Sequence, residues 1–118
     1  MLAGANWWRE RCQLLIVEGA GGLLSPLADD LSNAEFAQQL NADLLIVSAN
    51  RLGAINHTRL TVIAAEHFGL PIAGIVLNQA TAASDDSATT NGAAIRRYCR
   101  PPLVAALEHG GGLVYSLD

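Results

Sequence analysis

The chain has 118 residues, 51% hydrophobic and 15% charged, which is enough for one globular domain with a modest core and leaves no room for a second domain. Its formal net charge is −4, and the basic residues form no stripe beyond Arg96, Arg97 and Arg100, which argues against a nucleic-acid-binding surface. The expected partners are therefore small molecules or a second copy of the chain.

The cysteines and the absence of apolar targeting segments indicate the compartment. Cys12 and Cys99 belong to no CxxC motif, so we expect two reduced thiols rather than a disulfide. The first residues lack the apolar centre of a signal peptide, and no uninterrupted apolar run approaches the roughly 18 residues of a membrane helix. These features predict a cytoplasmic protein without a membrane segment.

A short helix containing Trp7, Trp8 and Arg11 is expected to lead into the first strand. Adjacent tryptophans are more typical of a core or an interface than of a ligand cage, because they carry a large apolar area. Residues 14–17 are apolar without alternation, which predicts a strand buried on both faces of a parallel sheet.

Glu18 follows this expected strand at its carboxyl end, the edge where open α/β sheets bind ligands. Gly19, Gly21 and Gly22 come next, and glycine allows positive φ and close approach of a ligand to the backbone. The alternative is an ordinary strand exit whose carboxylate only faces water. The residues alone leave both interpretations open.

The next two elements are a helix and a second buried strand. Ser32 or Asn33 can cap a helix over residues 33–40, and Asn41 with Asp43 marks the turn into a strand at 44–48. The apolar face expected for the helix consists of Phe36, Ala37 and Leu40.

The second strand leads into a turn at Gly53 and a helix from about Asn56 to His67 or Phe68. The free N–H groups at its start, near Ala54 to His57, favour an anion. His57 and His67 form no HExxH pattern, so a metal site is not expected there. Helical spacing predicts a buried face made of Leu60, Ile63, Ala64, His67 and Phe68.

A third strand is predicted at 72–77, and Asn78 stands at its carboxyl end. A buried asparagine amide can pair with the donor and acceptor of an adenine edge; the alternative is a turn-forming asparagine. Residues 81–91 are small and polar and are interpreted as a mobile loop. The remaining elements expected are a helix at 89–98, a strand at 103–107 and a last apolar piece at 113–117.

Three blocks, VEGAGGLLSPL, ANRLGAINHTRLT and GLPIAGIVLNQ, resemble in order and spacing the carboxyl-terminal half of dethiobiotin synthetase, an enzyme of biotin synthesis. The resemblance covers about residues 14–107. It implies an α/β protein with a partial P-loop-NTPase-like three-layer fold and a mostly parallel sheet that lacks the phosphate-loop strand. The whole chain, 1–118, is then a single truncated or half domain.

The resemblance also implies a reaction and residue roles. Proteins of this family use ATP and Mg²⁺ to add CO2 to the diamino acid 7,8-diaminononanoate and to close a cyclic urea. By motif, Glu18 would be catalytic and hold Mg²⁺, and the enzyme would be a homodimer whose interface includes the turn at Gly53. The substrate would lie against Gly19, Ala20, Gly21, Gly22, Gly53, Ala54, Ile55 and Asn56, and the nucleotide against Asn78, Leu107 and Glu108.

The sequence departs from this family in one respect: it contains no lysine and no GxxxxGK[ST] phosphate loop. In the family these groups lie on the amino-terminal half, and phosphoryl transfer depends on them. The isolated chain is therefore expected to be inactive. Three origins stay open: a truncated product, one half of a split enzyme that needs an amino-terminal partner, or a relic. The alternative function is a non-catalytic module for dimerisation or for binding a nucleotide or small acid.

Overall fold

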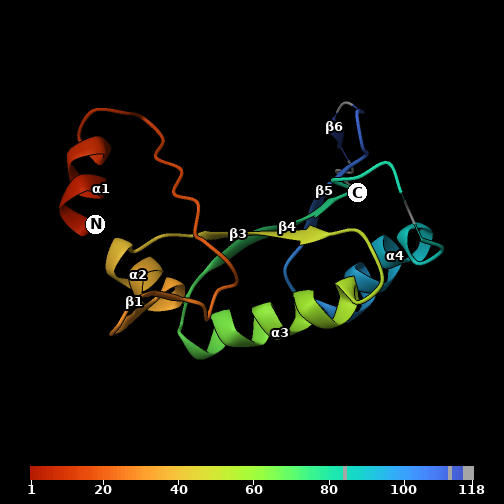
Figure 1. The fold of residues 1–118 in the computed structure, drawn as a ribbon, viewed down its shortest axis with the longest axis horizontal. Coiled ribbons are helices and arrows are strands. Elements are labelled where there is room, and N and C mark those ends of the chain that lie inside the picture. The colour runs from red at the N-terminus through yellow and green to blue at the C-terminus, as the bar shows by residue number, and fades with distance from the viewer. Residues whose placement is uncertain (84, 112, 116–118) are drawn as a thin grey trace.

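The computed structural model describes residues 1–83, 85–111 and 113–115. Its elements are α1 (Leu2–Arg9), β1 (Pro26–Ala28), β2 (Leu31–Ser32), α2 (Asn33–Leu40), β3 (Leu44–Ala49), α3 (Ala54–His67), β4 (Ile72–Asn78), α4 (Ala88–Tyr98), β5 (Leu103–Leu107) and β6 (Leu113–Tyr115) (Figure 1). Within these residues, no helix is long and apolar enough to cross a membrane.

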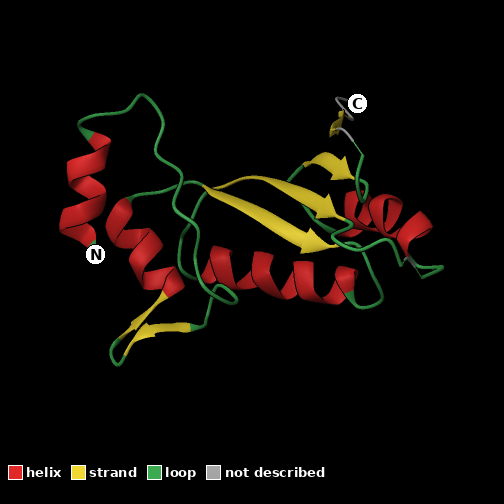
Figure 2. Ribbon diagram, turned by 45° about the horizontal axis from the view of Figure 1, so that its top comes forward, coloured by secondary structure: helices red, strands yellow, loops and turns green. Residues whose placement is uncertain are grey.

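The main sheet has the order β3-β4-β5-β6, in which the first three strands are parallel and β6 is antiparallel (Figure 2). Ala49 pairs with Asn78, and Asn78 pairs with Leu107, so the last residues of three strands stand side by side. The α/β class and the mostly parallel sheet predicted from the sequence are confirmed. The carboxyl ends of β3, β4 and β5 therefore form one edge.

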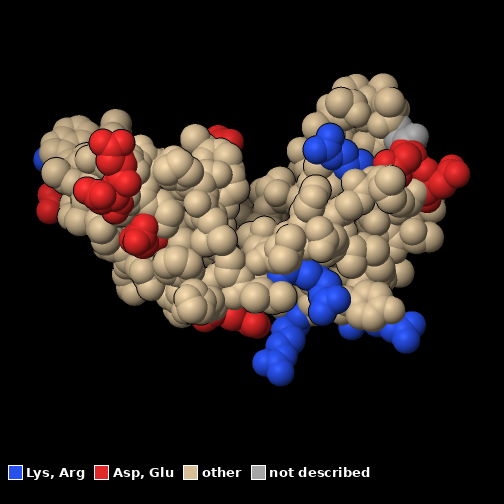
Figure 3. All heavy atoms as spheres, turned by 60° about the horizontal axis from the view of Figure 1, so that its bottom comes forward, with Lys and Arg blue, Asp and Glu red and all other residues tan. Residues whose placement is uncertain are grey.

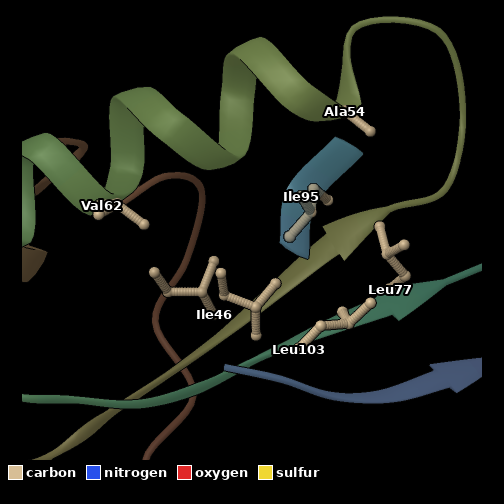
Figure 4. Close-up of a cluster of buried hydrophobic side chains, with 7 residues drawn as sticks. Ile46, Ala54, Val62, Leu77, Ile95 and Leu103 are labelled. Atoms are coloured by element: carbon tan, nitrogen blue, oxygen red, sulfur yellow. The ribbon is translucent and has the colours of Figure 1, made fainter. Parts of the chain in front are cut away.

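The core lies between the sheet and the two helices α3 and α4. Inward-facing side chains of the strands meet Ala54 and Val62 of α3 and Ile95 of α4, as the close-up in Figure 4 shows. This buried cluster consists of Ile46, Ala54, Val62, Ile75, Leu77, Ile95 and Leu103, and a second, smaller one consists of Ala34, Ala65 and Leu70.

The opposite face of β3 is open. Leu45 is 58% exposed and Val47 is 60% exposed. The alternate residues Ile46 and Ser48 face the other side of the sheet and are buried. The prediction of a strand buried on both faces is therefore wrong for β3 within the described residues. The continuous apolar run of β3 predicts a strand with both faces covered. In the described residues only the face toward α3 and α4 is covered.

The helix α3 buries a different face from the predicted one. Leu60 is 57% exposed and Ile63 is 56% exposed, and His67 is also exposed. The buried side chains are small or β-branched, which lets the helix lie close to the sheet: Ala54, Thr58, Val62 and Ala65. Thr58 also donates a hydrogen bond to Ser48 of β3 at 2.8 Å, so a polar residue was part of the buried face.

Residues 14–17 are not a strand, which corrects the prediction for the first apolar run. Leu14 is 75% exposed, Ile16 is 81% exposed and Val17 is 47% exposed. Among the described residues, none donates or accepts a backbone hydrogen bond to this run, so it has no neighbouring strand to complete it. The segment between this run and α2 contains the short antiparallel pair β1 and β2.

Other boundaries agree with the sequence. Ser32 caps α2: its hydroxyl accepts from the N–H of Glu35, whose carboxylate accepts from the N–H of Ser32 at 2.7 Å. Asn41 ends the helix in the left-handed conformation with φ 50°. The helix α4 and the strands β4 and β5 begin and end within a residue of their predicted positions. Residues 116–117 of the last predicted piece lie outside the described residues.

Candidate functional site

The carboxyl ends of β3, β4 and β5 are joined by backbone hydrogen bonds beyond the regular strands. The N–H of Asn50 donates to the carbonyl of Asn78 at 2.9 Å, and the N–H of Gln79 donates to the carbonyl of Leu107 at 2.9 Å. The carboxyl ends of β3 and β4 therefore meet, and the segment of Leu107 and Glu108 lies beside them. This edge is where open α/β sheets bind ligands.

Asn78 offers an amide group at this edge. Its side chain is half-buried and makes no hydrogen bond with the part of the chain that the structure describes. The neighbouring Asn50 differs, because its side chain donates to the carbonyl of Ala88 at 3.2 Å and accepts from Asn91. Asn78 is thus the asparagine of this edge whose donor and acceptor are both available to a ligand.

The start of α3 provides free backbone donors. Gly53, with φ 92°, precedes the helix and offers no capping side chain. The N–H of Ala54 donates to the carbonyl of Arg51 at 3.0 Å, whereas those of Ile55 and Asn56 have no acceptor among the described residues. The first turn of this 14-residue helix can therefore bind an anion.

A hollow of about 550 Å³ opens beside this helix start, between α3 and the beginning of α4. Its walls combine aliphatic side chains with polar ones and one guanidinium, a lining suited to an acid with an aliphatic chain. The lining residues include Leu52, Gly53, Ile55, Asn56, Arg59 and Leu60.

The loop before α3 is anchored to α4 by residues that sequence reasoning missed. Asn91 is 2% exposed, and its amide donates to Asn50 Oδ1 at 3.0 Å and to the carbonyl of Arg51 at 3.2 Å. Asp85 Oδ2 accepts from the N–H of Leu52 at 2.8 Å. Both residues belong to the segment 81–91, which we expected to be a mobile loop. A single buried amide in a polar stretch produces no hydrophobic periodicity from which its burial could be predicted.

Asp85 also organises the turn before α4. Its Oδ1 accepts hydrogen bonds from the hydroxyl and the N–H of Ser87, which is the local pattern of an aspartate-led turn. These bonds, first that from the Ser87 hydroxyl and then that from the N–H of Leu52, lower the pKa of Asp85 below its ordinary value of 3.8. The spacing of Asp85 and Ser87 was a signal in the sequence that could have been used.

The glycine loop has a defined shape of its own. Asn33, the first residue of α2, donates from its side chain to the carbonyl of Ala20 at 2.8 Å and to that of Gly22 at 2.9 Å. Ser25 Oγ accepts from the N–H of Gly22 at 2.9 Å. Gly21 has φ 75°, so this position favours glycine. Of the four loop amides, the one of Gly22 is therefore occupied by the protein itself.

Glu18 does not lie at the carboxyl edge of the sheet, which corrects the prediction that it follows a strand at the ligand-binding edge. It is exposed, has no hydrogen-bond partner in the described segments, and lines a separate hollow of about 610 Å³ together with Gly19. The walls of this second hollow come largely from α1, α2 and residues 15–17, and its lining shares no residue with the first. The physical reason is the missing strand partner of residues 14–17.

A magnesium site is not complete in these residues. The described part of the chain contains no group of three or more histidine, cysteine, aspartate or glutamate side chains that could hold an ion. Glu18 can supply one carboxylate ligand only, whereas Mg²⁺ requires six oxygen ligands in near-octahedral geometry. The residues present therefore do not fit a magnesium site by themselves.

The α/β fold with its mostly parallel sheet is that of a partial P-loop-NTPase-like domain, and comparison with known proteins identifies the family. A family model described as an AAA domain matches residues 6–114, so the chain belongs to this family. Confirming the resemblance seen in the sequence, the chain is similar to proteins named ATP-dependent dethiobiotin synthetase BioD.

Three of these relatives define the extent of the likeness. The chain is 37% identical over 117 residues to the protein of Rhodopirellula baltica, covering 92% of this chain and 46% of the relative. It is 44% identical over 96 residues to that of Bacillus subtilis, covering 81% and 42%. It is 49% identical over 90 residues to that of Anaeromyxobacter dehalogenans, covering 75% and 40%. The chain therefore spans less than half the length of these relatives.

Proposed function

We propose that this chain forms one part of an ATP-dependent dethiobiotin synthetase, whose reaction is the carboxylation and cyclisation of 7,8-diaminononanoate. The observation that carries the proposal is the identity of 37–49% to synthetases over most of this chain. The absence of lysine and of a phosphate loop means that the chain supplies binding surfaces but not the groups that neutralise a transferring phosphate.

Two surfaces of the carboxyl edge have roles in this proposal. Asn78, with its available amide, recognises adenine, and Leu107 and Glu108 lie against the nucleotide. The N–H groups of Ile55 and Asn56 bind the carboxylate of the diamino acid, whose aliphatic chain fits the adjoining hollow.

The remaining predicted residues are Glu18 and the glycine loop that follows it, of which Glu18 and Gly19 line the second hollow. Gly19, Ala20 and Gly21 contribute backbone N–H groups that have no acceptor within the described residues, and Glu18 contributes one oxygen ligand to a site completed from elsewhere. ATP and Mg²⁺ are thus proposed as cofactors of the assembled enzyme, and no catalytic step is assigned to this chain alone.

A homodimer through α3 is part of the proposal. Leu60 and Ile63 place apolar side chains on the outer surface of α3, next to the hollow at the helix start. Two copies related by a two-fold axis would cover these side chains and bring two carboxylate-binding helix starts to one interface.

The alternative is a non-catalytic module that binds a nucleotide or a small acid. The observation that favours it is the separation of the two hollows, which share no lining residue, so the described residues do not form one reaction site. An activity assay on an assembled protein distinguishes the two functions.

The test compares the chain alone with the chain supplied with the missing part. The purified chain, given diaminononanoate, bicarbonate, Mg²⁺ and ATP, is expected to form no dethiobiotin by mass spectrometry. The same chain fused to the part of the Bacillus subtilis relative that it does not match is expected to form product, and Asn78→Ala in the fusion is expected to raise the KM for ATP. A folded fusion that binds ATP but forms no product would favour the module.

A further inference from the structure

The loop that joins β3 to α3 has few internal contacts that fix its shape. It consists of residues 50–53, and Gly53 has no side chain that could cap the helix. Its backbone bonds are short-range: the N–H of Arg51 donates to the carbonyl of Ala49 at 3.0 Å, and that of Ala54 donates to the carbonyl of Arg51 at 3.0 Å. The direction in which α3 leaves the sheet edge therefore also depends on contacts from outside the loop.

Two residues of the segment that leads into α4 supply such contacts. Asn91, near the start of α4, is 2% exposed, and its side-chain amide donates to Asn50 Oδ1 at 3.0 Å and to the carbonyl of Arg51 at 3.2 Å. Asp85, ahead of the helix, accepts from the N–H of Leu52 through Oδ2 at 2.8 Å. The loop is thus held at three consecutive residues.

The carbonyl of Arg51 links the buried amide to the start of α3. It accepts both from the side chain of Asn91 and from the N–H of Ala54, the first residue of the helix. Because Ala54 uses its N–H in this way, the next donors along the chain, those of Ile55 and Asn56, are the ones that adjoin the hollow between α3 and α4. The position of this carbonyl therefore helps to determine where the first turn of α3 presents its free N–H groups.

Asn50 extends the same hydrogen-bond network to the edge of the sheet. Its N–H donates to the carbonyl of Asn78 at 2.9 Å, and its side-chain amide donates to the carbonyl of Ala88 at 3.2 Å. Hydrogen bonds consequently run from Asn91 through Asn50 to the carboxyl end of β4. A shift of the loop would break bonds to both α4 and β4.

The burial of Asn91 is explained by these bonds rather than by packing. One turn further along α4, Ile95 is fully buried in the apolar cluster, where a side chain contributes through its volume alone. A buried amide costs free energy unless it is hydrogen-bonded, and an apolar side chain of similar size would avoid that cost. The two shortest bonds of the Asn91 amide go to the loop, and only the longest, 3.4 Å to Ser87 Oγ, stays within the segment of α4.

We propose that Asn91 and Asp85 are positioning residues of the carboxylate site. They hold residues 50–52 so that the first turn of α3 presents the N–H groups of Ile55 and Asn56 to the hollow, and neither acts by touching the acid. Loss of either contact lowers the fraction of molecules whose helix start has the binding geometry, and the apparent affinity falls with that fraction. The identity of the acid rests on the proposed function, whereas the positioning is tested with any aliphatic carboxylate.

The first experiment titrates the chain with hexanoate and, separately, with adenosine, and follows the backbone amides by two-dimensional NMR. In the unaltered chain, hexanoate is expected to shift the amides of Ile55 and Asn56. Asn91→Leu, which keeps a similar volume but removes the donors, is expected to weaken hexanoate binding about fivefold or more. Adenosine shifts near Asn78 are expected to remain, because that side chain makes no bond with Asn91.

Asp85 provides a matched pair of variants in case Asn91→Leu does not fold. Figure 3 shows acidic and basic side chains on one face of the molecule, so a change of charge alters the field that an anion meets as well as the contacts. Asp85→Ala and Asp85→Asn both remove a negative charge, which by itself favours hexanoate, but only asparagine keeps an oxygen for the N–H of Leu52. Asp85→Ala is expected to weaken binding about twofold or more, and Asp85→Asn is expected not to weaken it.

Hydrogen exchange separates positioning from a purely structural role. In Asn91→Leu the amides of Leu52 and Ala54 are expected to exchange faster, because their acceptors are Asp85 and the carbonyl of Arg51. The amide of a residue in the middle of β4 is expected to keep its rate. Unchanged hexanoate affinity in a folded Asn91→Leu, equal effects of the two Asp85 variants, or no hexanoate shift at the α3 start of the unaltered chain would overturn the proposal.

The assembled enzyme gives a kinetic readout of the same role. In the fusion with the part of the Bacillus subtilis relative that the chain does not match, Asn91→Leu is expected to raise the KM for diaminononanoate more than the KM for ATP. Equal increases in both KM values would indicate a general loss of structure and contradict the positioning role. A fusion that forms no dethiobiotin, while the isolated chain shows the hexanoate effects, would overturn the proposed function and leave the positioning role intact.

Discussion

Asp85 connects the start of α4 to the loop that leads into α3. The bonds that it accepts from Ser87 and from the N–H of Leu52 favour its ionised form, so the folded protein holds its pKa below 3.8. A carboxyl group with a lowered folded pKa stabilises the structure above its unfolded pKa, and this stabilisation is lost as pH falls through the folded pKa. The loop at Leu52 should therefore loosen in acid.

The corresponding prediction concerns the Leu52 amide. In two-dimensional NMR spectra, its chemical shift is expected to change as pH is lowered through and below 3.8, when Asp85 becomes protonated. Asp85→Asn keeps an acceptor oxygen but cannot ionise, so its Leu52 amide should not follow pH in this range. Asp86→Asn is the control, and a Leu52 transition that is lost in Asp86→Asn but kept in Asp85→Asn would contradict the assignment.

Single residues differ in how far their positions and contacts could be predicted from the sequence. The position of Asn78 at the end of β4 was predictable, because the limits of this strand are clear from its apolar run. Asn91 was not, because its role depends on Asn50 and Arg51, forty-one and forty residues away, which meet it only in the folded chain. Side-chain to backbone bonds over such separations have no periodicity in the sequence.

At the scale of elements, sequence features within one helical turn predicted the helix boundaries correctly, whereas hydrophobic patterns did not predict correctly which faces and segments are packed. The capping box of Ser32 and Glu35 fixed α2 because both partners lie within one turn. Spacing alone selected the wrong face of α3, since its two sides both carry residues that can be buried. Residues 14–17 have strand character but remain unpaired, because a strand requires a neighbour that the described residues do not provide.

The outward face of α3 leads to a prediction about self-association. The chain is expected to dimerise at micromolar concentrations in light-scattering measurements, and Leu60→Asp is expected to shift it toward monomer, because the substitution places a charge in an apolar contact. Leu60 is more than half exposed, so the monomer should keep its fold and its circular dichroism spectrum. A monomer in the unaltered chain, at all concentrations, would argue against the interface.

For the whole molecule, the affinity for ATP follows from what the chain retains. The proposed adenine contact at Asn78 would contribute roughly 0.5 to 1.5 kcal/mol, and the proposed carboxylate contact at the α3 start about as much or less. No lysine and no phosphate loop add to these contributions. The isolated chain is therefore expected to bind ATP no more tightly than about millimolar, scarcely better than adenosine and with little dependence on Mg²⁺.

NMR titration measures this directly. Adenosine should shift signals near Asn78, and a simple carboxylate should shift signals near Ala54. Micromolar binding that requires Mg²⁺ would show that the chain holds a phosphate site of its own, with the loop at Gly19 to Gly22 as the first place to look. Asn78→Ala serves as the control, because it should remove the adenosine shifts and leave the carboxylate shifts.

Asn33 is both the first residue of α2 and the side chain that holds the carbonyls of Ala20 and Gly22. The first helical turn and the glycine loop are therefore coupled. When the helix start frays, the loop loses both hydrogen bonds from the side-chain amide of Asn33 at the same moment. The two segments should open and close as one cooperative unit, with a shared opening free energy. The stability of the short helix α2 thereby determines the fraction of time for which the backbone of Gly19 to Gly22 keeps one conformation.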